Sequence, residues 1–269
     1  MKVLLAVLAH PDDETFGMGG TLALYAQRGA QVQLVCATRG EAGTVSPEHL
    51  QGYQNIAQLR EAELRCAAGH LGLADLHFLG YRDSGMAGSP ENQHPEALAG
   101  ADLQEVTGRI TEHIRRIKPQ VVITFDPAGG YGHPDHIATH QATVEAFQAA
   151  GDSGRFPEAG APFQPQKLYF STFSRRFAGL SMALLRMIGH NPRRMGRNQD
   201  IDLSEIASQQ FPIHARVNYR PVVELKRQAT ACHASQLDWG PAGRGLAGLI
   251  WRLERLGTID TFMRAHPPA

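Results

Sequence analysis

The stretch VLLAVLAHPDDE, residues 3–14, decides how the rest of this chain is interpreted. Its first seven residues form an unbroken apolar run, which is typical of a strand covered on both faces in a parallel sheet. The run leads straight into His10, Pro11 and three acidic residues without a small-residue cleavage site, so a signal peptide is not favoured. We therefore expect a buried first strand over residues 3–9, with polar side chains at its carboxyl end.

Short apolar or β-branched runs recur along the first 175 residues and alternate with helix-like segments. The predicted strands are residues 3–9, 32–38, 76–79, 121–125 and 168–173. The predicted helices are residues 20–28, 55–71, 103–117 and 136–149. This alternation predicts an α/β fold with a mainly parallel sheet and right-handed crossovers. Ligands bind such sheets where the carboxyl ends of the strands emerge.

The alternation weakens beyond Phe173. Residues 174–212 are rich in Arg, Gly, Met and Asn, with Arg193, Arg194 and Arg197 close together, and we expect a lid or excursion there. A strand is then predicted over 213–219, and helices over 222–235 and 246–263. We therefore interpret residues 1–269 as one domain with a lid at 174–212.

Composition excludes several classes of protein. The chain has 269 residues, and 26 basic residues balance 26 acidic ones, which argues against a nucleic-acid binder. No stretch approaches the roughly 18 apolar residues of a membrane span. The three cysteines, Cys36, Cys66 and Cys232, are widely spaced and include no CxxC pair. They do not indicate a disulfide framework, and they favour a reducing cytoplasm.

Two polar clusters follow predicted central strands. The first is residues 10–14, and the second is His133-Pro134-Asp135-His136. Each places two ligand-type side chains three residues apart, His10 with Asp13 and His133 with His136. Because the carboxyl ends of parallel strands share one edge of a sheet, the two clusters can meet despite their separation in sequence. Imidazole nitrogen and carboxylate oxygen suit a divalent ion such as Zn²⁺, and three protein ligands plus water define a catalytic zinc site.

The adjacent carboxylates Asp12 and Asp13 can have different roles, one as a metal ligand and the other as a base that accepts a proton from a water molecule. The alternative is structural, since Asp, Pro and His are also common in turns and at helix starts. Asp135 and Glu14 are assigned to capping or to orienting a ligand histidine. His136 and His140 share a helix face, but they lack the Glu of a His-Glu-x-x-His site, so His140 is expected to pack or to be solvated.

Other features receive structural interpretations. GMGG, residues 17–20, does not complete a dinucleotide motif, and we expect these glycines to let a helix approach the sheet closely. The isolated histidines are interpreted as structural or surface residues: His49, His70, His77, His94, His113, His190, His214 and His266.

The quoted clusters identify a family resemblance. With AHPDDE at 9–14 and HPDH at 133–136, the chain resembles the LmbE-like, or PIG-L, family of zinc-dependent de-N-acetylases. Further matches occur in the same order: TRGEAG at 38–43, REAEL at 60–64, YRDSGM at 81–86, and Lys226 followed by HASQ at 233–236.

This resemblance implies a Rossmann-like, three-layer α/β fold and a role for each matched residue. Zn²⁺ would be held by His10, Asp13 and His136, and Fe²⁺ would fit the same ligands. Asp12 would be the general base, and His133 would stabilise an oxyanion or act as an acid, with Tyr131 reaching toward the intermediate. Arg60 and Asp83 match positions that hold sugar hydroxyls. The alternatives are a surface salt bridge for Arg60, a turn for Asp83 and a loop aromatic for Tyr131.

The implied reaction removes the N-acetyl group from an N-acetylglucosaminyl conjugate and releases acetate and the free amine. The conjugate would carry malate, as in a bacillithiol pathway, or inositol, as in a mycothiol pathway, and the arginine cluster favours the anionic malate. Two other functions are left open. One is another amidase or deacetylase, acting on thiol conjugates, chitin fragments or antibiotic intermediates, and the other is a non-catalytic carbohydrate-binding protein. The expected partner is a small molecule, with no nucleic acid or membrane, and a homo-oligomer is compatible with the sequence.

Overall fold

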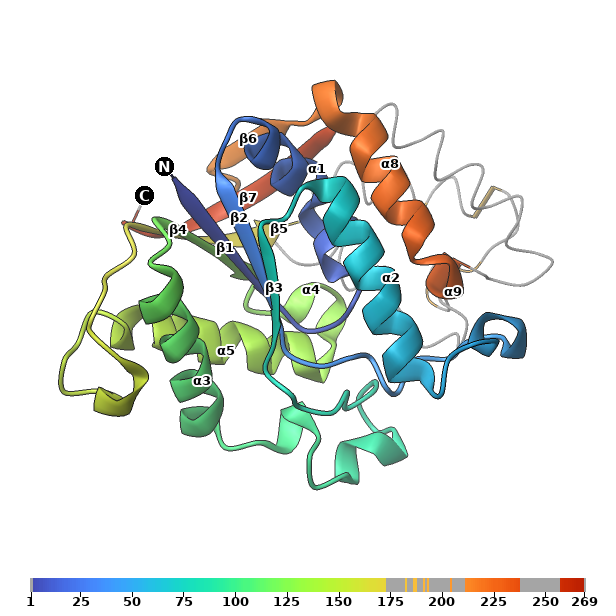
Figure 1. The fold of residues 1–269 in the computed structure, drawn as a ribbon, viewed down its shortest axis with the longest axis horizontal. Coiled ribbons are helices and arrows are strands. Elements are labelled where there is room, and N and C mark those ends of the chain that lie inside the picture. Colours follow the sequence, from blue (N-terminus) through green and yellow to red (C-terminus); the bar gives the residue numbers. More distant parts are fainter. Residues whose placement is uncertain are drawn as a thin grey trace.

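One mixed sheet organises the described part of the chain. The computed structural model describes residues 2–172, 211–237 and 257–268, and also 182, 186, 187, 191, 193 and 204. The strands are β1 Val3–Leu8, β2 Gln31–Cys36, β3 Asp75–Phe78, β4 Val121–Phe125, β5 Lys167–Thr172, β6 Ala215–Asn218 and β7 Ile259–His266. They follow the order β3-β2-β1-β4-β5-β7-β6 (Figure 1). The first five strands are parallel, whereas β7 runs antiparallel to both β5 and β6.

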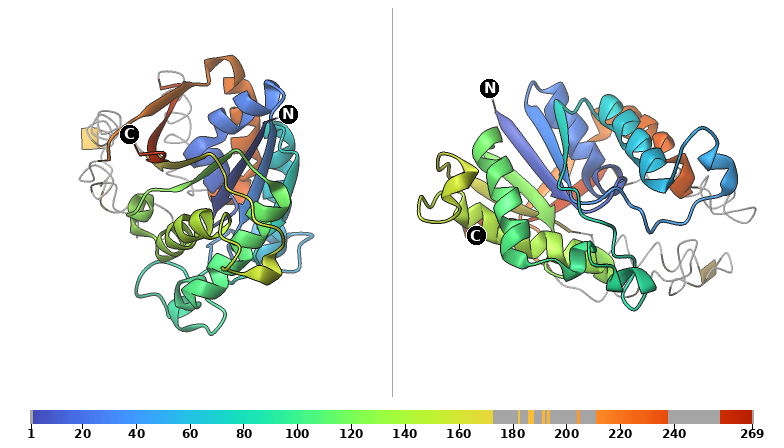
Figure 2. Two further views of the ribbon diagram at one scale, coloured as in Figure 1. Left: turned by 90° about the vertical axis from the view of Figure 1, so that its left-hand side faces the viewer. Right: turned by 60° about the horizontal axis from the view of Figure 1, so that its bottom comes forward.

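Helices cover both faces of this sheet, as Figure 2 shows from two sides. The helices are α1 Asp13–Gln27, α2 Ile56–Leu71, α3 Leu103–Ile117, α4 Gly129–Gly132, α5 Pro134–Ala149, α8 Val223–Cys232 and α9 Ala234–Leu237. Side chains point alternately to opposite faces of a strand. Leu4 and Leu8 of β1 therefore pack with α1, α2 and α8 in one core, while Leu5 and Val7 pack with α3 and α5 in the other. The expected three-layer α/β architecture is confirmed.

Local signals set the ends of the central helices. Asn55 caps α2 by accepting a hydrogen bond from the amide of Gln58, and Gly72 ends the helix in the left-handed conformation. Asp102 caps α3 in the same way. These elements lie where the sequence predicts them, since their apolar spacing and their end signals agree.

Two predicted helix boundaries are wrong. The first helix begins at Asp13 rather than at residue 20, and it is kinked at Met18, where φ is −153°. Its glycines lie inside the helix, and Gly20 makes room for Tyr219 rather than for the sheet, because an added Cβ would lie 2.1 Å from that ring. Farther along the chain, the helix predicted over 246–263 is contradicted at residues 259–263, which belong to strand β7, Ile259–His266.

The position of β7 explains that second error. It is hydrogen-bonded to β5 on one side and to β6 on the other, so pairing in the sheet overrides the local periodicity. β7 also supports the first helix. The carboxylate of Asp260 accepts hydrogen bonds from the amide and the hydroxyl of Thr21, both at 2.7 Å. Residues 257 and 258 are not helical either, whereas residues 246–256 of the predicted helix and most of the predicted lid at 174–212 lie outside the described residues.

The cysteines also depart from expectation. Cys66 on α2 and Cys232 on α8 form a disulfide, whereas Cys36 is a buried free thiol. The two partners are 166 residues apart in sequence, and they meet because α2 and α8 pack against each other. The spacing of the cysteines in the sequence does not reveal this packing. The disulfide therefore removes the support that the spacing lent to a reducing compartment. Within the described ranges, no helix has the length and hydrophobicity needed to cross a bilayer.

Candidate metal centre and active site

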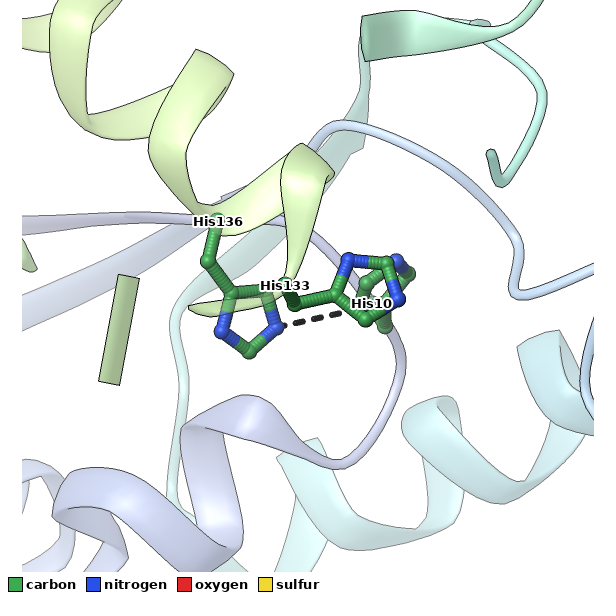
Figure 3. Close-up of side chains that lie close together, drawn as sticks. All are labelled: His10, His133 and His136. Atoms are coloured by element: carbon green, nitrogen blue, oxygen red, sulfur yellow. Dashed lines mark hydrogen bonds between the residues drawn. The ribbon is translucent and has the colours of Figure 1, made fainter. Parts of the chain in front are cut away.

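The two polar clusters converge at the carboxyl edge of the sheet. β1 and β4 are hydrogen-bonded neighbours, so the residues that follow them emerge side by side. His10 follows β1, and His133 and His136 lie at the start of α5 (Figure 3). His10 Nδ1 and His136 Nε2 are 3.2 Å apart, and the rings of His10 and His133 are 4.5 Å apart between centroids. The predicted meeting of the two clusters is confirmed.

Asp13 completes a set of three ligand-type atoms. Its Oδ1 is 3.3 Å from His136 Nε2, and its Oδ2 is 3.6 Å from His10 Nδ1. Ligand atoms about 2.1 Å from a tetrahedrally coordinated ion lie about 3.4 Å from one another. The spacing of these atoms therefore fits a small divalent cation.

Hydrogen bonds orient both imidazole rings toward that position. His10 Nε2 lies 3.0 Å from Asp135 Oδ2 and 3.4 Å from Asp83 Oδ1, while His136 Nδ1 lies 3.2 Å from the carbonyl oxygen of Gly129. In each histidine, one ring nitrogen therefore contacts a hydrogen-bond acceptor, while the other ring nitrogen faces the second histidine and Asp13. A carboxylate or carbonyl behind the ring is the usual support of a metal-binding histidine.

The electrostatics of this group also favour a cation. Burial opposes charge on His10, but the carboxylates of Asp83, Asp13 and Asp135 outweigh it and raise the pKa of His10 well above its ordinary value. Burial likewise opposes charge on Asp13, and the facing imidazoles of His136 and His10 hold the pKa of that carboxyl well below its usual range. The buried carboxylates therefore hold a positive charge among them, which a divalent ion would supply.

Two other groups of side chains around His10 also place their possible ligand atoms within 4.8 Å of one another. The two sets are His10 with His133 and His136, and His10 with Asp83, His133 and Asp135. Asp83 and Asp135 contact the outer nitrogen of His10, whereas Asp13 faces both His10 Nδ1 and His136 Nε2.

Asp12 lies beside this group in a strained conformation. Its φ is 121°, a region that residues other than glycine rarely adopt and that is often found at functional sites. Arg60 Nη2 donates to Asp12 Oδ2 at 3.0 Å, and the Asp12 amide donates to Glu14 Oε2. Burial raises the pKa of Asp12 to about 6, against the opposing charge of Arg60. This carboxyl therefore titrates in the range where a general base is effective.

The rings of His133 and Tyr131 also contact this group. The amide of Asp135 donates to His133 Nδ1 at 3.1 Å, which leaves Nε2 to carry the proton of the neutral ring. Burial and the neighbouring rings of His10 and His136 lower the pKa of His133 to about 2, so the ring is neutral at physiological pH. The ring of Tyr131 stands edge-on to His136, with centroids 5.1 Å apart, and burial raises the pKa of its hydroxyl.

Arg60 and Asp83 are buried parts of the same cluster. Besides Asp12, the Arg60 guanidinium donates to the carbonyl oxygens of Gly40 and Pro11, so the alternative of a surface salt bridge is wrong. Asp83 does shape a turn, since it accepts a hydrogen bond from the amide of Gly85, and it also contacts His10.

Supporting residues include some that sequence reasoning had not singled out. Ser84 donates to Asp135 from both its amide and its hydroxyl, and thereby fixes the carboxylate behind His10. His233 Nε2 lies 2.8 Å from the buried carboxylate of Glu14. Ser84 and His233 both belong to motifs quoted above, so the motifs marked them without indicating their contacts. His140 bonds the carbonyl oxygen of Phe125 and packs as expected.

The fold and the site define a class of α/β enzyme with a candidate metal centre at the carboxyl edge of the sheet. A family model described as PIG-L, GlcNAc-PI de-N-acetylase, matches residues 5–147. The chain therefore belongs to the PIG-L family of de-N-acetylases.

Individual relatives agree with this assignment. The chain is 38% identical to a 1D-myo-inositol 2-acetamido-2-deoxy-alpha-D-glucopyranoside deacetylase from Streptomyces avermitilis, over 87% of this chain and 83% of the relative. It is 37% identical to the protein of the same description from Rhodococcus erythropolis, over 98% and 91%. Among solved structures, N,N'-diacetylchitobiose deacetylase from Pyrococcus horikoshii has a similar fold, with a TM-score of 0.66, 20% identity and coverage of 98% and 83%.

Proposed function

We propose that this chain hydrolyses the acetamide of an N-acetylglucosamine unit joined to inositol, releasing acetate and the free amine. The observation that carries the proposal is the set of facing atoms of His10, Asp13 and His136, with the carboxylate of Asp12 beside it. The choice of inositol as the aglycone rests on the activity for which the relatives from Streptomyces avermitilis and Rhodococcus erythropolis are named, since both match most of the chain.

His10, Asp13 and His136 would hold the metal ion. Zn²⁺ suits this set of two imidazoles and a carboxylate, and Fe²⁺ suits it as well. When bound, the ion polarises the acetamide carbonyl and lowers the pKa of water, which makes water a nucleophile near neutral pH.

Asp12 acts as the general base. Its carboxylate removes a proton from the attacking water as the water oxygen bonds to the acetamide carbon. The carbon–nitrogen bond then breaks, and the carboxyl of Asp12 returns that proton to the departing amine. Arg60 holds Asp12 in place through its 3.0 Å contact, so the base is oriented before substrate binds.

His133 stabilises the negative charge that develops on the carbonyl oxygen. Its neutral ring donates from Nε2, because Nδ1 already accepts the amide of Asp135. Tyr131, beside the histidines, adds a second donor through its hydroxyl. We also propose that Arg60 and Asp83 contact sugar hydroxyls, in addition to positioning Asp12 and His10.

A malate conjugate is the competing substrate. It was expected from the arginine cluster, of which Arg193 alone lies among the described residues. The relatives named above give that substrate no support, so it serves here as the comparison in the test.

A substrate panel tests the proposal. The protein is stripped of metal with a chelator, restored with Zn²⁺, and given N-acetylglucosaminyl inositol, N-acetylglucosaminyl malate, diacetylchitobiose or free N-acetylglucosamine, with acetate release as the measurement. We expect release to require metal and kcat/KM to be highest for the inositol conjugate. A higher kcat/KM for the malate conjugate would refute the proposal that inositol is the aglycone. Absence of acetate release from every substrate would refute the proposed deacetylation. Zinc content of His10→Ala and His136→Ala tests the ligand set separately.

A further inference from the structure

A second group of metal-ligating side chains lies at the junction of α2 and α8. These helices lie side by side in Figure 1, and the disulfide joins Cys66 of α2 to Cys232 of α8, with Cα atoms 5.8 Å apart. His70 follows Cys66 by four residues on α2, which places both on one face of the helix. One ligand atom from each of the three residues lies within 4.8 Å of the other two.

The chemistry of this group differs from that of the candidate active site. It offers two sulfur atoms and one imidazole, which are the donors that soft or borderline divalent ions prefer. Cys66 and His70 are exposed and Cys232 is partly buried, so an ion can reach them from solvent. The group shares no residue with the cluster around His10.

We propose that reduction of the Cys66–Cys232 disulfide creates a second metal site, in which both thiolates and His70 bind a divalent ion such as Zn²⁺ or Co²⁺. A dithiol reductant supplies two electrons and two protons, becomes a disulfide itself, and leaves two cysteine thiols. Binding of the ion then releases those two protons and forms two metal–sulfur bonds. Water fills the fourth position, because the described residues provide no fourth ligand within the group.

Metal and disulfide exclude each other, because sulfur atoms bonded to one another are not thiolate ligands. In either state the same two helices are linked. This linkage matters because α2 carries Arg60 and Glu63, while α8 leads to Ser235, whose amide and hydroxyl both donate to Glu63. The site is independent of the proposed deacetylase reaction.

Cobalt absorption distinguishes the two metal sites. Co²⁺ bound by thiolates has an intense charge-transfer band in the near ultraviolet, whereas the cluster of His10, Asp13 and His136 offers only nitrogen and oxygen. Cys36 is buried on β2, where its thiol donates to the carbonyl oxygens of Ala9 and Thr38, and burial raises the pKa of that thiol. The band therefore reports on Cys66 and Cys232.

The experiment titrates the full chain with Co²⁺ in reduced and oxidised form. We expect the reduced protein to bind one more ion per chain than the oxidised protein and to gain the charge-transfer band. The double variant Cys66→Ser/Cys232→Ser is expected to lack the band while it retains the other ion. Since the oxidised wild-type protein carries no substitution, it gives the same comparison if that variant does not fold.

His70 is tested separately. His70→Ala is expected to weaken the thiolate-linked site by at least about tenfold, since loss of even an outer-shell partner costs about 10–100-fold in affinity. His94→Ala, at a partly buried histidine of another segment, is the control and should leave the affinity unchanged. Absence of the band in reduced wild-type protein, its persistence in the double serine variant, or full affinity in His70→Ala would overturn the proposal.

Discussion

At the scale of single residues, Asp12 combines an unusual backbone conformation with an unusual pKa. Its backbone is in the left-handed half of φ space, its carboxyl has a raised pKa, and its position depends on Arg60 and Glu14. Such strain persists only where the surroundings over-determine the conformation. The sequence predicts that Asp12 is the general base, and that role stays a prediction, whereas the strain and the contact with Arg60 could not be foreseen from the sequence.

Replacing Asp12 tests its role as a base. We expect Asp12→Ala to retain Zn²⁺, because the proposed ligands remain, and to lower turnover by about 10²–10⁴-fold. Metal content and acetate release are measured on the same preparation, with Asp75→Asn as a control at an exposed carboxylate. Unchanged turnover would remove Asp12 from the reaction.

Gly40 makes room for the arginine that holds Asp12. Its φ is +70°, and an added Cβ would lie 2.0 Å from Arg60 Nη1. We expect Gly40→Ala to displace Arg60 and to lower kcat substantially. Gly52→Ala is the matched control, since its φ is +87° and nothing lies within 4 Å of an added Cβ.

Both glycine substitutions should cost about 1–2 kcal/mol from backbone strain. The loss of kcat beyond that of the control therefore measures the displacement of Arg60. Equal activity of the two variants would contradict this account.

At the scale of elements, helices and strands with local sequence signals were predictable, whereas those determined by long-range pairing were not. The strands β1 and β4 and the helices α2 and α3 were predictable, because their apolar spacing and end signals are contained in the segments themselves. The start of α1 was missed because its first turn is polar, and its buried Glu14 is matched by His233 from a distant segment. The strand β7 was missed because its partners β5 and β6 determine it.

Helix α3 offers a test of pH dependence through His113. Burial, with the charge of Arg116 and the neighbouring His77, lowers the pKa of His113 to about 4. In the unfolded chain His113 takes up a proton near its ordinary pKa of 6.5, whereas in the folded chain it takes up that proton only near pH 4. The free energy of unfolding therefore decreases as the pH falls from about 6.5 to about 4.

We expect His113→Gln to lose less unfolding free energy than wild type between pH 7 and 4.5. The difference should be about 1 kcal/mol once partial exposure of the ring is allowed for. Urea unfolding at the two pH values measures this difference, with His94→Gln, at a partly buried histidine of another segment, as the control. Identical pH dependence of His113→Gln and wild type would show that this ring does not titrate as stated.

At the scale of the whole molecule, the order of the strands builds the candidate site. The sequence predicted two clusters at the ends of parallel strands, but only the sheet order makes β1 and β4 neighbours. The support from Ser84 and His233 depends on the packing of segments that are distant in sequence, and so does the disulfide. No local pattern in the chain contains these contacts.

The disulfide is expected to stabilise the whole fold. It closes a separation of 166 residues, and native disulfides commonly contribute about 2–5 kcal/mol by restricting the unfolded chain. In metal-free buffer, reduction should therefore lower the midpoint of urea unfolding. Cys66→Ser/Cys232→Ser should match the reduced protein and not respond to reductant. A midpoint that is the same with and without reductant would argue against a stabilising link.

The bond from Asp260 to Thr21 has a consequence for biosynthesis. The helix that presents Asp13 to the two imidazoles is anchored by a strand that follows it at a distance of 239 residues along the chain. A polypeptide still growing on the ribosome would lack this anchor until β7 had emerged from the exit tunnel. The active site could then be completed only after β7 has been synthesised.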